Sequence, residues 1–239
     1  MILHGLFGSS DNWQTLGRAL AEKYVVYLVD QRDHGHSPHS DAIEYSLMAT
    51  DVKELIEQEG LSIVNLVGHS MGGKTAMTFA QLYPELLNKL VVVDIGPRVY
   101  DDRHSQILEG VLTADLEILR SRKEVEDHLA GHIPEPGVRQ FIMKNLFWIE
   151  DKKLGWRANF PLLKKDLSSI VASISPDRVE VPTLFIRGGE SDYILKEDIP
   201  AIKEQFTRSS FETITFAGHW VHAQAPEEFL QMVTDFIEE

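Results

Sequence analysis

A serine flanked by glycines follows an apolar run in the first third of the chain. Residues 65 to 77 read NLVGHSMGGKTAM, so Ser70 lies at the centre of a G-x-S-x-G pattern with Gly68 and Gly72. The residues before the pattern have the character of a buried strand, and those after it have helical character. This order is typical of a nucleophile elbow, where glycines let the backbone turn sharply and expose one hydroxyl. A phosphate-binding or plain strand-to-helix turn is the alternative interpretation.

A serine hydroxyl becomes an effective nucleophile when a base takes its proton, and that base is usually a histidine. Among ten histidines, His219 in FAGHW follows the last predicted strand, where a loop can bring an imidazole to the serine. His222 lies closer to the final helix and is expected to pack or cap there, and His69 is expected to have a structural role. The pattern predicts Ser70 as the nucleophile and His219 as the general base.

Acyl transfer also requires backbone N–H donors for the oxyanion that develops on the carbonyl. The segment HGLFGSS follows the first apolar residues and can present the N–H of Leu6. The N–H of Met71, at the start of the helix after Ser70, is the second predicted donor. The alternative is that HGLFG forms only a tight turn.

The elements that would position these residues alternate between strands and helices. One helix is expected over residues 48–59, after Ser46 as N-cap and before Gly60 as its stop, and others near 196–206 and from Pro226 onward. This alternation predicts an α/β fold with a doubly wound, mostly parallel sheet. Strands are expected at residues 2–3, 24–30, 62–68, 89–97, 181–189 and 211–220, and those at 24–30, 62–68 and 89–97 have the apolar composition of buried parallel strands.

The central part of the chain interrupts this alternation. Residues 98–175 contain charged amphipathic patterns, including VRQFIMKNLFWIE, and no convincing buried strand. They predict an all-helical lid inserted into a core formed by residues 1–97 and 176–239. Residue 1 lies almost at the end of the first strand, so any strands that would precede it in the sheet are expected to be absent.

The composition is that of an ordinary globular protein with one core, since 43% of the 239 residues are hydrophobic and 25% are charged. The 23 basic and 37 acidic residues give a net charge of −14, which disfavours nucleic acid and anionic membranes as partners. The chain has no cysteine, no apolar run long enough for a membrane span and no signal-peptide pattern. A cytoplasmic location is the default expectation.

Five segments together carry a family resemblance: HGLFGS, DQRDHGHS, GHSMGGK, VVVDIGP and GHWVHAQAP. They resemble the α/β-hydrolase superfamily and, within it, the small esterase and thioesterase branch that includes a bacterial acyl-CoA esterase and the eukaryotic abhydrolase domain-containing protein 11. The resemblance spans residues 2 to 238 and is weakest in the lid. It implies the α/β-hydrolase fold, a catalytic triad and chemistry that requires no metal or organic cofactor.

The resemblance implies two candidates for the acid of the triad. Most members carry it in a G-x-x-D loop, but GGESDYI places Ser191 there, with Asp192 next to it. The branch uses an aspartate after the next strand, and VVVDIGP offers Asp94, 24 residues beyond Ser70. A carboxylate that closes an apolar strand is costly unless it is paired, which favours Asp94 over Asp192. Ser191 is expected to join the same hydrogen-bond network.

Other polar residues of these segments are expected to support the site. Arg32 and Asp33 in DQRDHGHS are expected to be architectural, and Lys74 to be solvated or to lie behind the site. Aromatic side chains could line an acyl pocket, although ordinary packing is the alternative for each of them: Phe7, Trp13, Phe147, Trp148 and Trp220.

The predicted function is a serine hydrolase that cleaves small carboxylic esters or thioesters with short to medium acyl chains through an acyl-enzyme, with Asp94 orienting His219. A lyase or carbon–carbon hydrolase on the same fold is one alternative. A non-catalytic ligand-binding protein is another, because fold alone does not fix function. The sequence is compatible with a monomer or a homodimer.

Overall fold

A computed structural model of the chain describes residues 1–150 and 153–239, which divide into two compact units. The first unit contains Met1–Gln31, Glu44–Val99 and Ser173–Glu239, and the second contains Arg32–Ile43 and Tyr100–Ala172. The segment Arg32–Ile43, which the sequence assigned to the core, therefore groups with the inserted region. The role of that region as a lid stays a prediction.

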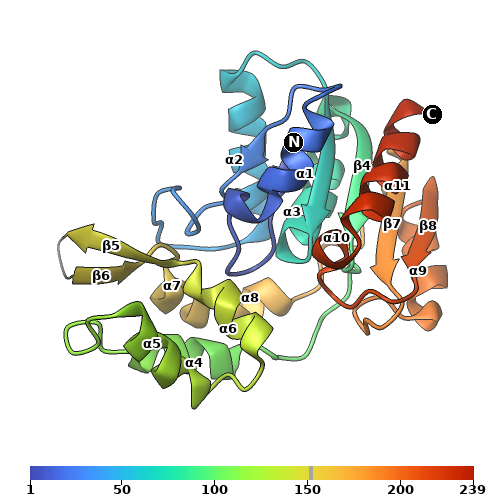
Figure 1. Ribbon diagram of the computed structural model, residues 1–239. Helices are drawn as coiled ribbons and strands as arrows, with labels where there is room; N and C mark the ends of the chain where they lie inside the picture. The colour runs from blue at the N-terminus through green and yellow to red at the C-terminus, as the bar shows by residue number, and fades with distance from the viewer. Residues whose placement is uncertain (151–152) are drawn as a thin grey trace. The chain divides into compact units, whose positions relative to one another are not determined.

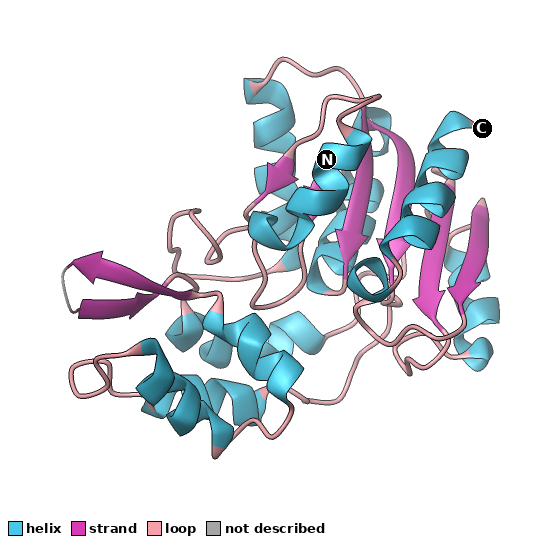
Figure 2. Ribbon diagram, viewed as in Figure 1, coloured by secondary structure: helices cyan, strands magenta, loops and turns pink. Residues whose placement is uncertain are grey.

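The first unit is built on a six-stranded sheet in the order β2-β1-β3-β4-β7-β8 (Figures 1 and 2). Every neighbouring pair in this sheet is parallel, so all the strands end at one edge. This arrangement confirms the predicted fold class, and in such sheets ligands bind outside the carboxyl ends of the strands. The strands are β1 (Ile2–Leu3), β2 (Leu28–Val29), β3 (Val64–His69), β4 (Leu87–Val93), β7 (Thr183–Gly188) and β8 (Ser209–Ile214).

Helices cover both faces of this sheet, because its central strands are apolar on both sides. On one face, α1 (Gln14–Leu20) and α11 (Pro226–Glu238) share a core cluster with β1, β3, β4, β7 and β8. On the other, α3 (Met71–Leu82) packs against β3 and β4, and α2 (Tyr45–Gln58) packs beside α3. Phe206, at the end of α9 (Ile199–Gln205), contacts Phe185 of β7 with ring centroids 5.3 Å apart.

Shorter helices complete the first unit: η1 (Ser10–Trp13), η2 (Pro84–Leu86), η3 (Lys196–Asp198) and α10 (Val221–Gln224). No helix in residues 1–150 or 153–239 combines the length and the apolar character that crossing a membrane requires.

Two local predictions for the first unit are wrong. Of the apolar run 24–30, only Leu28–Val29 forms a strand, and it lies half-buried at the edge of the sheet, with Val25 83% exposed. The composition identifies an apolar run, but it does not show whether that run will pair with neighbouring strands on both sides or lie at the edge of the sheet. The helix α2 begins at Tyr45 after Glu44, so Ser46 lies inside it and is not the N-cap. Gly60 follows the helix end with φ 66°, as expected for a stop.

The second unit is not all-helical, which corrects the prediction for residues 98–175. Between its helices, β5 (Leu146–Glu150) and β6 (Lys153–Trp156) pair as an antiparallel hairpin. The pattern VRQFIMKNLFWIE suggested one helix, but that helix ends at Met143 and the aromatic and β-branched residues beyond it favour a strand. The helices are α4 (Ser105–Thr113), α5 (Arg122–Ala130), α6 (Pro136–Met143), α7 (Phe160–Lys165) and α8 (Leu167–Val171).

Asp33 attaches the segment Arg32–Ile43 to the rest of the second unit. Its carboxylate is fully buried and accepts hydrogen bonds from the N–H of Ser40 at 2.8 Å and from Nδ2 of Asn159 at 2.9 Å. The N–H of Asn159 donates to the carbonyl oxygen of Asp33 at 2.9 Å. These contacts are those of an architectural residue.

The turn at the end of β3 leaves no room for a side chain at Gly68, which yields a stability prediction. A Cβ built there would overlap the carbonyl oxygen of Gly72 and would lie 2.8 Å from Cα of Gly73. We expect Gly68→Ala to lower the free energy of unfolding by about 1 to 3 kcal/mol, measured by urea denaturation, because the backbone must shift.

Gly137→Ala is the matched control. Gly137 is exposed in α6, and a Cβ built on it meets no atom within 4 Å. Alanine should therefore stabilise the protein by up to about 1 kcal/mol, since it favours the helix. Equal stability of the two variants would contradict the steric explanation.

Candidate active site

The residues predicted to do chemistry lie at the carboxyl edge of the sheet. Ser70 follows β3, Asp94 follows β4, and His219 lies in the loop after β8. The N–H of Ser70 donates to the carbonyl oxygen of Val93 at 3.0 Å, and the N–H of Asp94 donates to that of Ile186 at 2.8 Å. The ladder of parallel strands thus continues into the site and places Ser70 next to Asp94.

Ser70 occupies a strained backbone conformation. Its φ of 52° and ψ of −118° are unfavourable for a residue with a Cβ, and such strain concentrates at functional sites. The residue is half-buried at the start of α3 and so retains exposed surface, as a nucleophile elbow requires. Phe7 and Asp94 also have positive φ, 62° and 48°.

Asp94 and His219 form a direct pair. Nδ1 of His219 lies 2.8 Å from Oδ2 of Asp94, whose side chain is fully buried, whereas the side chain of His219 is 21% exposed. A carboxylate can only accept, so a neutral His219 carries its proton on Nδ1 and leaves Nε2 with a lone pair. This tautomer is the one that a general base needs.

Two further donors complete the surroundings of the Asp94 carboxylate. The N–H of Gly188 donates to Oδ1 at 2.9 Å, and the hydroxyl of Ser191 donates to Oδ2. Asp192, the other candidate for the acid, is exposed, and Nδ1 of His219 is already occupied by Asp94. The structure therefore brings Asp94 and Ser191 together at His219.

The loop with the first predicted oxyanion donor lies against the serine. A Cβ built on Gly5 would be 3.2 Å from Cβ of Ser70 and 2.9 Å from Nδ1 of His69, so only a glycine allows this approach. Within the described part of the chain, no acceptor contacts the backbone N–H of Leu6 or of Met71. Both N–H groups thus remain available to a ligand.

His4 holds this loop, a role that the sequence reasoning missed. Its Nδ1 donates to the carbonyl oxygen of Gly5 at 2.9 Å, and its Nε2 accepts from the N–H of Gln31 at 3.0 Å. The side-chain amide of Gln31 donates to the carbonyl oxygen of His4 at 2.6 Å. Burial lowers the pKa of His4, which suits a neutral ring that donates once and accepts once. Its place between a strand and the glycine loop was the available signal.

His69 and His222 have the structural roles expected of them. Nε2 of His69 lies 2.9 Å from the carbonyl oxygen of His219, so the ring donates there and anchors the His219 loop. The ring of His222 stacks on Trp13, with centroids 4.1 Å apart. Burial and the neighbouring histidines hold the pKa of His69 well below its usual 6.5, and burial lowers that of His222 to about 3.

Lys74 is buried, not solvated, one helical turn after Ser70. Only 1% of the residue is exposed, and its Nζ lies 5.8 Å from the centroid of the Tyr45 ring. Burial and the nearby Arg98 lower the pKa of this ammonium group to about 7. Lys74 is therefore part of the packing behind the elbow.

The structure distributes the aromatic residues proposed for an acyl pocket over both units. Trp13 belongs to the core cluster, so packing accounts for it, and Phe7 is buried in the Gly5 loop. Trp220 is half-buried, with its ring 6.2 Å from that of His219. Phe147 and Trp148 belong to the hairpin of the second unit. The acyl pocket stays a prediction.

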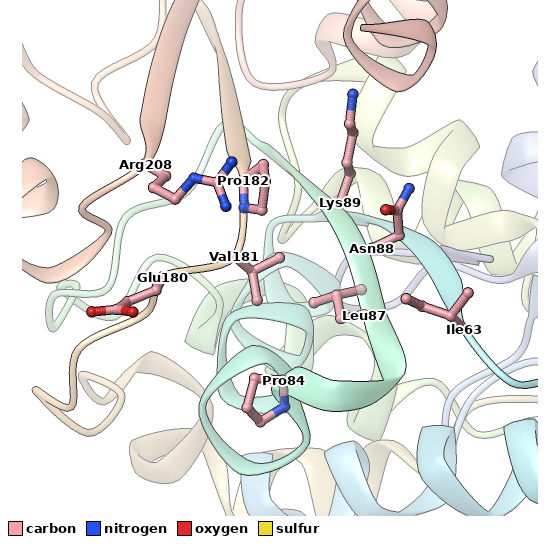
Figure 3. Close-up of a pocket in the computed structure, with 9 residues that line it drawn as sticks. All are labelled: Ile63, Pro84, Leu87, Asn88, Lys89, Glu180, Val181, Pro182 and Arg208. Atoms are coloured by element: carbon pink, nitrogen blue, oxygen red, sulfur yellow. The ribbon is translucent and has the colours of Figure 1, made fainter.

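A separate cavity of about 560 Å³ lies at the opposite edge of the sheet (Figure 3). Its walls come from the amino ends of β3, β4, β7 and β8, and include Ile63, Leu87, Pro182 and Arg208. It is therefore distinct from the candidate active site.

Known proteins resemble this chain in both sequence and fold. Residues 1–123 match the family described as the alpha/beta hydrolase fold. A marine microorganism esterase of known structure superposes with a TM-score of 0.95 at 42% identity, covering 98% of this chain and 93% of its own. The sn-1-specific diacylglycerol lipase ABHD11 of Mus musculus is 37% identical, over 99% of this chain and 80% of its own length. Esterase YbfF of Escherichia coli K12 is 32% identical, over 99% of this chain and 92% of its own length. The chain therefore belongs to the α/β-hydrolase family, as its motifs predicted.

The buried histidines predict a loss of stability in mild acid. Burial lowers the pKa of His222 from 6.5 to about 3, and the pKa values of His4 and His69 are also depressed. Below its own pKa the unfolded chain binds protons that the folded chain does not, so the free energy of unfolding falls as the pH falls. For His222 alone the loss is about 2 kcal/mol at about pH 5, since one pH unit corresponds to about 1.4 kcal/mol.

Urea unfolding of His222→Phe tests this contribution, because phenylalanine can occupy the ring position on Trp13 but cannot take up a proton. We expect the variant to gain about 2 kcal/mol relative to wild type between about pH 7.5 and about pH 5. If the free energies of unfolding of wild type and variant differ by the same amount at every pH in this range, His222 does not carry the acid sensitivity.

Proposed function

We propose that this α/β hydrolase is a serine esterase that cleaves carboxylic esters or thioesters with short to medium acyl chains through an acyl-enzyme. The observation that carries the proposal is the 2.8 Å hydrogen bond between His219 and the buried Asp94, at the edge where Ser70 stands on a strained turn. The names of the relatives, esterase and lipase, agree with ester cleavage.

In the proposed acylation step, Nε2 of His219 removes the hydroxyl proton while Oγ of Ser70 attacks the substrate carbonyl. The proton then passes from His219 to the leaving alkoxide or thiolate as the carbon–oxygen or carbon–sulfur bond breaks. Asp94 keeps the imidazole in the required tautomer and faces the positive charge that the ring acquires. Its burial strengthens this interaction, because the surroundings have a low dielectric constant.

The developing oxyanion is proposed to bind the N–H groups of Leu6 and Met71. Each donor is expected to lower the barrier by roughly 2.7 to 4 kcal/mol, the range measured for comparable groups. His4 and Gln31 fix the Leu6 loop before substrate arrives, so the donors need little reorganisation. In deacylation, His219 takes a proton from water as the water oxygen attacks the acyl carbon. It returns that proton to Oγ of Ser70 as the ester bond to the serine breaks and the product acid leaves.

Hydrolysis of p-nitrophenyl esters from acetate to decanoate tests the proposal. We expect turnover by wild type, a loss of at least about 10⁴-fold in Ser70→Ala and about 10²- to 10⁴-fold in Asp94→Asn. The matched control is Asp192→Asn, which should stay within about twofold because this carboxylate is exposed. The acyl chain length with the highest kcat/KM would indicate the size of the acyl site.

A fluorophosphonate probe followed by peptide mass mapping distinguishes an acyl-enzyme hydrolase from a lyase or a non-catalytic relative. The proposal expects one adduct, on Ser70, that is lost in Ser70→Ala. Full hydrolysis by Ser70→Ala, or an unlabelled wild type without turnover, would refute the assignment.

A further inference from the structure

Tyr193 presents the face of its ring to the ring of His219. The two centroids are 3.8 Å apart and the planes differ by 17°. No other aromatic contact of His219 is as close among the described residues, since the rings of His69 and Trp220 lie at 4.7 and 6.2 Å. The arrangement is therefore a parallel stack on one face of the imidazole.

The loop after β7 holds Tyr193 in this position. The N–H of Tyr193 donates to Oγ of Ser191 at 3.3 Å, and the Ser191 hydroxyl donates to Asp94. The next residue, Ile194, is buried, and its carbonyl oxygen accepts from Nη1 of Arg187 at 3.0 Å. Tyr193, Ser191, Asp94 and His219 thus form a closed ring of contacts in which the stack fixes the face of the imidazole and Asp94 fixes one edge.

A stacked aromatic face interacts differently with the two charge states of His219. The face of a phenol ring carries partial negative charge, so it attracts a cation more strongly than a neutral ring. His219 becomes an imidazolium when it takes the serine proton. Among the described residues, the titratable groups that face it are Asp94, His69, His222 and Tyr193 itself, and burial disfavours the charged forms of the two histidines.

We infer that Tyr193 is a positioning residue of the proposed esterase reaction, which holds the His219 imidazole in place and stabilises its protonated form by stacking. The inference rests on the proposed function for its effect on catalysis. Its effect on the imidazole itself requires no turnover. The two parts can therefore be measured separately.

The first measurement is the titration of His219 by NMR, followed through its imidazole carbon-bound protons in the full chain. His219→Gln assigns the signal. Replacing Tyr193 by Leu removes the ring face and should lower the midpoint of the His219 titration by about 0.5 to 1 pH unit. Tyr193→Phe keeps the ring and should leave the midpoint within about 0.2 unit of wild type.

The second measurement is the pH profile of ester hydrolysis. In Tyr193→Leu, kcat should fall about tenfold with KM within about twofold, and the acidic limb of kcat/KM should move to lower pH by the same shift as the NMR midpoint. Tyr193→Phe should retain the wild-type profile. Circular dichroism verifies that each variant is folded.

Substituting pentafluorophenylalanine at position 193 separates electrostatics from packing, and it serves also if Tyr193→Leu fails to fold. This residue keeps the size of the ring but reverses the charge distribution of its face, so it should lower the His219 midpoint as leucine does. A wild-type midpoint in both the leucine and the pentafluorophenylalanine variants would overturn the inference. A shifted midpoint in a protein that hydrolyses no ester would support the stack and refute the proposed function.

Discussion

A buried carboxylate at the end of β4 is the constraint on which the site depends. Asp94 has no exposed surface, and an unpaired charge in that position would cost several kcal/mol. The chain offsets this cost with a backbone N–H at the end of β7, a hydroxyl in the loop that follows and the imidazole of His219. The groups that stabilise the buried carboxylate therefore also hold together the loops that follow β4, β7 and β8.

The strained backbone conformations at the carboxyl edge of the sheet depend on the rigidity of the sheet and its helices. Positive φ values at Phe7, Ser70 and Asp94 each cost on the order of 1 to 3 kcal/mol, and they persist only if the surrounding structure imposes them. Parallel strands packed by helices on both faces supply that rigidity, and the hydrogen bonds of Ser70 and Asp94 to neighbouring strands extend it into the loops. A mobile scaffold would let these residues relax and would separate the serine from its partners.

How much the sequence predicts depends on how local the determining contact is. The elbow was predictable because the glycines, the preceding strand and the following helix all lie within a few residues of Ser70. Asp94 required the family resemblance, since its partner His219 is 125 residues away. The edge position of β2 and the pairing of β5 with β6 were missed because both depend on which neighbours a strand acquires. The stack of Tyr193 on His219 has no signal in the sequence, because it depends on side-chain orientation.

Four histidines meet around the elbow, and their environments separate their tasks. His4, His69 and His222 are at most 5% exposed, and burial disfavours the charged form of each. His4 and His69 use their N–H groups to fix the Gly5 loop and the His219 loop. His219 alone of the four combines partial exposure with a carboxylate partner and a stacked aromatic face. In the proposed mechanism, burial therefore disfavours three of the four imidazoles as acceptors of the serine proton, and the geometry leaves His219, held by the Asp94 carboxylate, as the single base.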